Sequence, residues 1–410
     1  MSRARRWSGG LLLLALSLLA GEGMLQLLAW RVPAVDRVLT PVWAVPARIP
    51  DPLLGERGNP RWFDHDARGF RNPSAAEHAD VVTLGDSQTY GVSANRSETW
   101  PSVLGERSGQ TVYDMAFPGW GPGEAYLLLD SALALHPTVV VIGLYFGNDF
   151  FDVFTLGARV PEIRAFLPPR LDDAATGLER AAPLAASVRF LGAAGDTARP
   201  PAPGEGLDPR RVLSEHSKLY AVARAIRSLL TGEEGRPALL ARDLDRALTE
   251  ATDAERQFFS VYRGAEWRTL LTAPYRNRVL DDRDPRIRAG FEATPGLLAR
   301  MDRECRDRGT RFVVVLLPTK ESVFAPRVGD LAAHPALDSL VRNEARLREE
   351  LIAALDSAGV SHLDALDALR RSSRQPYFED ADGHPNAVGH EVIARVVGER
   401  LTREAARPIK

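Results

Sequence analysis

Cysteine is nearly absent from this chain, because Cys305 is the only one among 410 residues. A disulfide within the chain is therefore impossible, and a zinc site built from several cysteines is excluded. The chain also lacks a large net charge, since it has 52 lysine and arginine residues and 54 aspartate and glutamate residues. Because no strong field of one sign covers the whole protein, the composition gives no indication of a nucleic-acid partner.

Motifs of several other enzyme classes are also missing. "GDSQT" at 85–89 lacks the second glycine of the α/β-hydrolase elbow. "HEVIA", which begins at His390, lacks the second histidine of a zinc-protease helix, and no glycine-lysine loop for phosphate binding occurs. "GWGPGE" at 119–124 lacks the glycine spacing of a dinucleotide fingerprint. We therefore expect no metal and no cofactor.

The N-terminus has the pattern of an export segment. Three arginines within the first six residues precede an apolar stretch in which Glu22 is the only charged residue. Residues 9–30 are long enough to cross a bilayer as a signal anchor, and a cleaved signal peptide is the alternative. No clear cleavage site follows the leucine run, which favours the anchor, whereas Glu22 counts against a span. We expect residues 1–31 to hold the protein in the cell membrane with its catalytic domain outside the cytoplasm; cleavage would give a secreted or periplasmic protein.

The length of the chain favours one catalytic domain with a large insertion. Residues 32–78 are rich in proline, arginine and aspartate and are interpreted as a stalk and lead-in. Short apolar strands then alternate with helices over residues 79–149, which predicts a parallel sheet. The alternation breaks over residues 150–294, a largely helical insertion, and resumes over 295–404. The catalytic domain is therefore expected to be discontinuous.

Ser87 follows the first strand, "DVVTL", and precedes a helix. At the carboxyl edge of a parallel sheet it is placed either to act as a nucleophile or to cap the helix, and the serine block alone leaves both roles open. A serine nucleophile needs a histidine base and a carboxylate that fixes the tautomer of that base. Among eight histidines, only His384 lies in a turn-rich segment before the last helix with a carboxylate, Asp382, two residues away.

Four blocks occur in order along the chain: "GDSQTYG", "AFPGWGPGE", "GLYFGNDF" and "DADGHPNAVGHEVIA". Together they resemble the blocks of the SGNH (GDSL-type) hydrolase superfamily over about residues 60–150 and 295–404. "FDHDARGFRNP" is similar to the lead-in of many bacterial members. The resemblance implies a three-layer α/β/α fold with a mostly parallel, flavodoxin-like sheet, and the insertion lies outside it.

The same resemblance assigns roles to individual residues. It implies that Ser87 is the nucleophile and that His384 is the general base, oriented by Asp382. Backbone N–H groups of Ser87 and Gly119 and the side-chain amide of Asn148 would form the oxyanion hole, which acyl transfer needs because negative charge develops on a carbonyl oxygen.

The position of the acid departs from the pattern of many relatives. They place it three residues before the histidine, where this chain has Ala381. Asp382 resembles an Asp-x-His variant, and Asp380 is the reserve candidate. Asp364 and Asp367, near the preceding strand, are less favoured.

The function expected from these observations is that of a serine esterase acting on an acetyl or other small acyl ester, with an acylated extracytoplasmic glycan as the substrate. An O-acyltransferase is the variant, because "VVVLLPTKESVF" resembles a segment of SGNH-like proteins of alginate acetylation. A non-catalytic glycan-binding or assembly protein is the alternative from another class. Trp120 could stack on a sugar ring of the substrate or pack inside the protein. Lys320 could reach the substrate or lie in a loop exposed to solvent.

Overall fold

The computed structural model describes residues 3–32, 35, 46–169, 217–220, 222–223, 226, 243–251 and 253–405. Much of the predicted insertion, including 170–216 and 227–242, lies outside the described residues. What is described of the insertion is mainly helical, with one hairpin formed by β6 (Ser260–Arg263) and β7 (Arg268–Leu271).

A five-stranded parallel sheet forms the centre of the molecule. Its strands run in the order β4-β3-β5-β8-β9. Their bounds are β3 (Val81–Leu84), β4 (Val112–Asp114), β5 (Val139–Tyr145), β8 (Arg311–Leu317) and β9 (His362–Asp364). Every residue of β5 is buried, because helices cover both faces of the sheet. The predicted α/β class with a flavodoxin-like sheet is confirmed.

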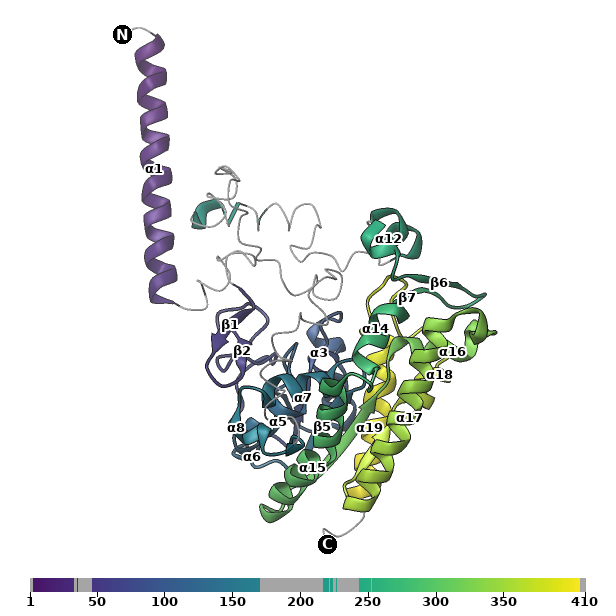
Figure 1. Ribbon diagram of the computed structural model, residues 1–410. Helices are drawn as coiled ribbons and strands as arrows, with labels where there is room; N and C mark the ends of the chain where they lie inside the picture. The colour runs from purple at the N-terminus through teal and green to yellow at the C-terminus, as the bar shows by residue number, and fades with distance from the viewer. Residues whose placement is uncertain are drawn as a thin grey trace.

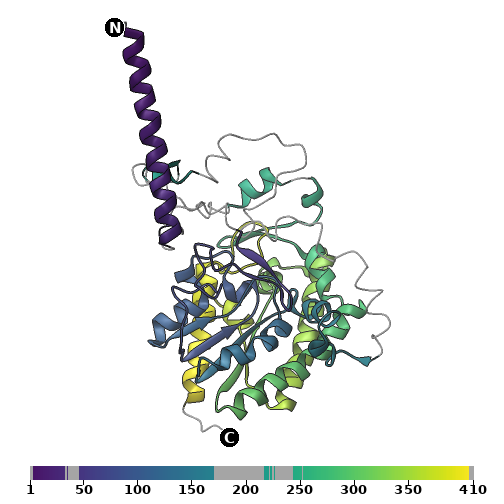
Figure 2. The ribbon, with the colours of Figure 1, turned by 90° about the vertical axis from the view of Figure 1, so that its left-hand side faces the viewer.

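The helices divide between the two faces of the sheet. The chain leaves β3 in one direction to reach β4 and then runs in the other direction to β5, β8 and β9. Because such crossovers are right-handed, the two directions place their helices on opposite faces. Helix α4 packs against α19 on one face, whereas α15 packs against α17 on the other; in Figure 2 the yellow α19 and the green α15 and α17 lie on different sides of the sheet. The longer helices are α4 (Trp100–Ser108), α7 (Asp149–Gly157), α14 (Ala273–Leu280), α15 (Pro285–Asp307), α16 (Lys320–Val328), α17 (Pro335–Ala358) and α19 (Ala387–Ala405).

Shorter helices fill the connections. They are α3 (Ser87–Tyr90), α5 (Pro122–Leu127), α6 (Leu129–Leu133), α8 (Pro161–Arg164), α12 (Leu244–Glu250), α13 (Asp253–Arg256) and α18 (Leu366–Arg370), with 3₁₀ turns at Arg96–Glu98 and Leu331–Ala333. The strand order reverses between β3 and β5, and ligands bind at such a switch point, outside the carboxyl ends of the strands. The topology therefore places a candidate site after β3 and β5.

Helix α17 shows how the sequence selects one buried face. Leu340, Leu347, Leu351 and Leu355 recur at spacings of seven or four and are fully buried. Gly359 ends the helix in a left-handed conformation with φ 68°. The helix therefore packs one apolar stripe against the large cluster that surrounds the sheet.

Residues 46–78, part of the predicted stalk and lead-in, pack against the catalytic domain. They contain an antiparallel hairpin formed by β1 (Arg48–Asp51) and β2 (Gly55–Gly58). Arg71 donates to the carbonyl oxygens of Tyr90, Gly91 and Ala94 at 3.0, 2.6 and 2.9 Å. This arginine therefore ties the lead-in to the segment that follows α3.

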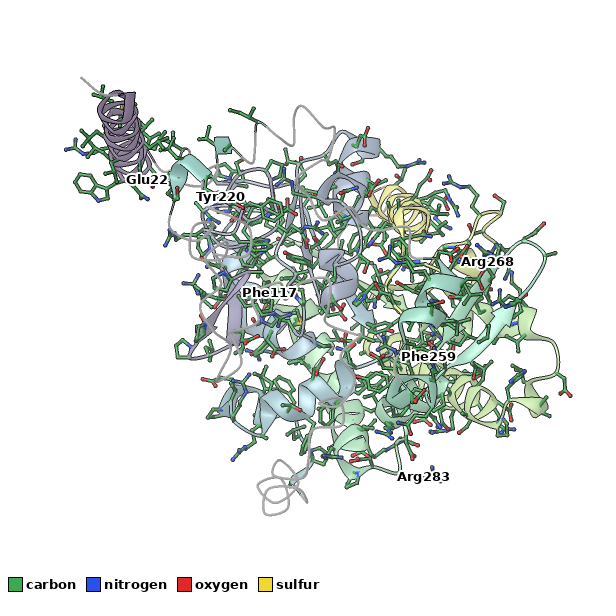
Figure 3. All side chains as sticks on the ribbon, turned by 90° about the horizontal axis from the view of Figure 1, so that it is seen from above. Glu22, Phe117, Tyr220, Phe259, Arg268 and Arg283 are labelled. Atoms are coloured by element: carbon green, nitrogen blue, oxygen red, sulfur yellow. The ribbon has the colours of Figure 1, made fainter. Side chains whose placement is uncertain are left out.

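The N-terminal helix α1 (Arg3–Arg31) extends away from the body of the molecule (Figure 1). Its Glu22 carboxylate accepts hydrogen bonds from the Ser217 hydroxyl at 2.9 Å and from the N–H groups of Lys218 and Leu219 at 2.8 and 2.9 Å. Figure 3 shows Glu22 beside Tyr220. Among the residues that are described, no helix is both long and apolar enough to cross a membrane, so the predicted transmembrane helix is not supported.

A buried carboxyl group at the end of β4 makes stability depend on pH. Asp114 accepts hydrogen bonds from the Thr83 hydroxyl at 2.7 Å and from the Ala116 N–H at 3.1 Å. Burial raises the pKa of Asp114 from its usual 3.8 to about 7. The folded protein therefore keeps a proton that the unfolded chain loses, and this stabilisation is lost as the pH rises from about 4 through about 7.

We predict that Asp114→Asn reduces the fall in unfolding temperature between pH 5 and pH 8. The asparagine oxygen can still accept both hydrogen bonds but does not ionise. Thermal unfolding followed by circular dichroism at both pH values measures the effect, with Asp367→Asn on the exposed surface of α18 as the control. A fall as large in Asp114→Asn as in the control would contradict the prediction.

Candidate active site

Ser87 is the first residue of α3, directly beyond the carboxyl end of β3. Gly85 makes the turn with φ 145°, and a Cβ there would lie 2.6 Å from Thr89 Oγ1 and 2.9 Å from the Gly143 carbonyl oxygen. The turn therefore requires glycine. Asp86 caps α3 by accepting a 2.9 Å hydrogen bond from the Gln88 N–H. The capping role that the sequence left open for Ser87 thus belongs to Asp86.

The structure brings Ser87, His384 and Asp382 into one chain of hydrogen bonds. Ser87 Oγ lies 2.8 Å from His384 Nε2, and His384 Nδ1 lies 2.5 Å from Asp382 Oδ1. If Nδ1 carries the proton donated to Asp382, Nε2 is free to accept the proton of the Ser87 hydroxyl. This is the arrangement that makes serine nucleophilic.

The other candidate acids do not contact His384. Asp380 accepts a 3.0 Å hydrogen bond from the backbone N–H of Asp382 and so shapes the loop. Asp364 pairs with Arg348 at 2.8 Å, and Asp367 is exposed at the surface. Asp382 is therefore the carboxylate placed to orient the base.

Three donors predicted for the oxyanion hole surround the same space. Ser87, Gly119, Asn148 and His384 line one cavity of about 390 Å³. Within the described residues, neither the N–H of Ser87 nor that of Gly119 donates to another group. Asn148 directly precedes α7 and donates one amide hydrogen to Asp152, which leaves its second amide hydrogen for a ligand.

The carboxyl groups behind these donors are buried. Burial raises the pKa of Asp149 and of Asp152 well above the usual range. Burial therefore favours the neutral form of both groups. A shift in this direction reduces the negative charge beside the position where an oxyanion would form.

Trp120 does not lie where a sugar could stack on it. Its indole N–H donates to the carbonyl oxygen of Glu56 at 2.9 Å, and its ring packs against Phe70 and Phe117. Only 4% of Trp120 is exposed, because the hairpin formed by β1 and β2 covers it. The expected sugar-stacking role of Trp120 is therefore corrected to a packing role.

Lys320 does not reach the substrate cavity either. It is buried at the start of α16, and its Nζ donates to the carbonyl oxygens of Phe378, Asp380 and Asp382 at 2.8, 2.6 and 3.0 Å. The sequence suggested two interpretations of Lys320, a contact with the substrate or a position in a solvated loop, and both are wrong. Lys320 holds the loop that carries the acid of the triad.

Sequence reasoning missed several polar residues at the site. Ser93 donates its hydroxyl hydrogen bond to the second oxygen of Asp382. Tyr145 and Arg276 line the cavity, the first at the end of β5 and the second in α14. Only Tyr145 had a sequence signal, since it stands in the third block. No group of three histidine, cysteine or carboxylate side chains among the described residues is arranged to hold a metal ion.

Comparison with known families bears on the part of the chain that carries the base and the acid. Residues 275–409 match the family model described as the SGNH hydrolase-like domain of the acetyltransferase AlgX. This part of the chain is therefore similar to an SGNH hydrolase-like domain. The resemblance inferred from the four sequence blocks is thereby confirmed.

Solved structures give weaker likenesses. A putative lipolytic protein of the G-D-S-L family from Desulfitobacterium hafniense shares 12% identity, with coverage of 78% of this chain and 97% of that chain and a TM-score of 0.35. A GDSL-like lipase from Bacteroides thetaiotaomicron shares 10% identity, with coverage of 79% and 87% and a TM-score of 0.34. Scores this low carry no argument about this chain, and no curated protein matches it.

The role of Lys320 in positioning the acid loop can be tested by Lys320→Met. The substitution removes the donor that three carbonyl oxygens share. Thr269 Oγ1 still donates to that of Phe378 at 2.9 Å, whereas the carbonyl oxygen of the buried Asp382 loses its Lys320 donor, and an unsatisfied buried group costs about 1–3 kcal/mol. We predict that kcat for a small acetyl ester falls by roughly tenfold or more while KM changes little, because the acid and base lose their alignment.

The control for this prediction is Arg303→Met, which removes an exposed cation from α15. It should leave both kinetic constants unchanged. A rise in KM without a fall in kcat in Lys320→Met would contradict the positioning role and return Lys320 to substrate binding.

Proposed function

We propose that this protein is a serine esterase that removes an acetyl or other small acyl group from a glycan outside the cytoplasm. The observation that carries the proposal is the continuous hydrogen-bonded relay from Ser87 through His384 to Asp382, which opens into the cavity beside the oxyanion donors. The basic and apolar N-terminus supports export of the domain. The glycan is inferred from the sequence resemblance alone.

The proposed reaction begins with attack of Ser87 Oγ on the ester carbonyl. His384 Nε2 takes the hydroxyl proton, and Asp382 stabilises the imidazolium that forms. Negative charge on the carbonyl oxygen is met by the N–H groups of Ser87 and Gly119 and by the amide of Asn148. His384 then returns the proton to the leaving alcohol, which leaves the acyl group on Ser87.

The second half of the reaction releases the enzyme. Water enters the cavity, gives a proton to His384 Nε2 and attacks the acyl carbon. The tetrahedral intermediate uses the same three donors, and its collapse regenerates the Ser87 hydroxyl with the proton from His384. The proton transfers are supported by the 2.8 Å distance between Ser87 Oγ and His384 Nε2, and the proposed oxyanion donors line the same cavity.

Acyl transfer to a sugar is the second candidate function. It is favoured by the match of residues 275–409 to the domain of an acetyltransferase. Both reactions pass through the same acyl-enzyme and differ only in whether water or a sugar hydroxyl attacks it. An acetyl donor supplied with and without a glycan acceptor distinguishes them, since transfer increases donor consumption and yields acetylated glycan.

Substitution of the relay tests the proposed chemistry. We predict that Ser87→Ala and His384→Ala each lower kcat for p-nitrophenyl acetate by about three or more orders of magnitude, because nucleophile and base act as a unit. Circular dichroism checks that the variants remain folded. Turnover close to that of the natural protein in either folded variant would reject the mechanism.

The two nearby aspartates give a matched pair. Asp382→Asn should lower kcat severely, because the amide favours the wrong tautomer of His384. Asp380→Asn should have a mild effect, since its amide oxygen can still accept from the N–H of Asp382. The reverse order of the two effects in the same kinetic assay would show that the acid is assigned incorrectly.

A further inference from the structure

Arg276 is an uncommitted cation in the wall of the catalytic cavity. It extends from α14 and lines the cavity together with Ser87 and His384. Only 6% of the residue is exposed. Among the described residues its guanidinium forms no ion pair and no hydrogen bond, and its Nε is shut off from solvent without a partner.

The other two arginines of this cavity are committed. Arg71 pairs with Asp64 at 2.7 Å and donates to three backbone carbonyl oxygens. Arg48 pairs with Glu56 at 2.9 Å. Arg276 is thus the cavity arginine whose donors are left for a ligand.

A buried guanidinium without a partner is costly, because arginine stays charged and its donors lose water. The rings of Tyr145 and Tyr275 lie 5.8 and 5.6 Å from its central carbon and offset part of that cost. The buried carboxylate of Glu321 acts on Arg276 only electrostatically. Its Oε1 accepts from the N–H and hydroxyl of Thr272, and its Oε2 has no hydrogen-bond partner among the described residues. A ligand anion would supply the direct partner that Arg276 lacks.

A second uncommitted donor lies beside the first. The Tyr145 hydroxyl has no hydrogen-bond partner within the described part of the chain, and Tyr145 lines the same cavity. Burial raises the pKa of Tyr145 above its usual range, so the hydroxyl keeps its proton as a donor. Two such donors on one wall suit the oxygens of a carboxylate.

The place of Arg276 identifies the part of the substrate that it meets. A Cβ at Gly383 would lie 2.5 Å from a terminal nitrogen of Arg276, so the guanidinium lies against the residue that precedes His384. In the proposed mechanism His384 protonates the oxygen of the leaving alcohol. The guanidinium therefore lies on the side of the alcohol, whereas Gly119 and Asn148 serve the carbonyl oxygen.

We propose that Arg276, assisted by Tyr145, binds a carboxylate on the alcohol portion of the substrate. The substrate is then an acyl ester of an alcohol that carries a negative charge. The kinetic test of this inference rests on the proposed esterase or acyltransferase function. Binding of the anion, by contrast, does not require turnover.

The test compares 4-acetoxybenzoate with 4-acetoxybenzamide, two acetyl esters that differ in the charge of the alcohol portion. The natural protein should have the higher kcat/KM for the carboxylate ester. Arg276→Gln should lower that preference by about tenfold or more, as expected for loss of a charged hydrogen-bond donor, and mainly through KM. Arg276→Lys should retain part of it, because the charge remains but the planar fork is lost.

Arg278→Gln is the matched control, since it removes the same charge from an exposed position of the same helix. It should leave the preference unchanged. An equal loss of preference in the two glutamine variants, or an equal slowing of both esters in Arg276→Gln, would overturn the proposal.

Two further measurements test the anion site independently of folding defects in the variants and independently of the esterase function. In the natural protein, benzoate should inhibit turnover competitively and benzamide should not; equal inhibition would overturn the anion site. In Ser87→Ala, calorimetry should detect binding of 4-acetoxybenzoate that Arg276→Gln in the same background removes. Binding without turnover in the natural protein would support the anion site and reject only the catalytic proposal, whereas equal binding with and without Arg276 would reject the anion site.

Discussion

The hydrogen bond between Ser87 and His384 joins two residues that are 297 positions apart in the chain, at a distance of 2.8 Å. It exists only because the sheet order places the end of β3 beside β5 and because the loop before α19 returns to that edge. Strand β7 holds this loop from one side, since the N–H of Leu270 donates to the carbonyl oxygen of Glu379 at 2.9 Å. The buried ammonium of Lys320 holds it as well, because it gathers three of its carbonyl oxygens. The position of the base, His384, therefore depends on Lys320, a residue that does not line the substrate cavity.

Burial controls the charges around the nucleophile. Burial raises the pKa of the carboxyl groups behind the oxyanion donors and so favours their neutral form. On the other side, the guanidinium of Arg276 has no hydrogen-bond partner within the described residues. The cavity thus combines a donor-rich pocket for the carbonyl oxygen with a cationic wall beside the base. This division is a property of the tertiary structure, because α14 and β5 contribute adjacent side chains from distant parts of the chain.

The sequence predicted the sheet and the order of its main elements because strands buried on both faces leave continuous apolar runs, as in β5. Ser87 and His384 could be singled out because each stands in a short local motif. The surroundings of a side chain were harder to predict. Trp120 looked exposed in a glycine-rich turn, yet the hairpin at 48–58 covers it. Lys320 looked like a loop residue, yet three carbonyl oxygens from 58 to 62 positions away surround its amine. Arg276 has no motif at all, and only the packing of α14 reveals it.

The central claim is that Ser87 is the residue that becomes acylated. Its most direct test is covalent labelling with a fluorophosphonate, followed by mass spectrometry of the digested protein. The account predicts one phosphonylated residue, Ser87, and loss of labelling when His384 is replaced by alanine, because the hydroxyl then lacks its base. Equal labelling with and without His384, or labelling of another serine with Ser87 unmodified, would contradict it.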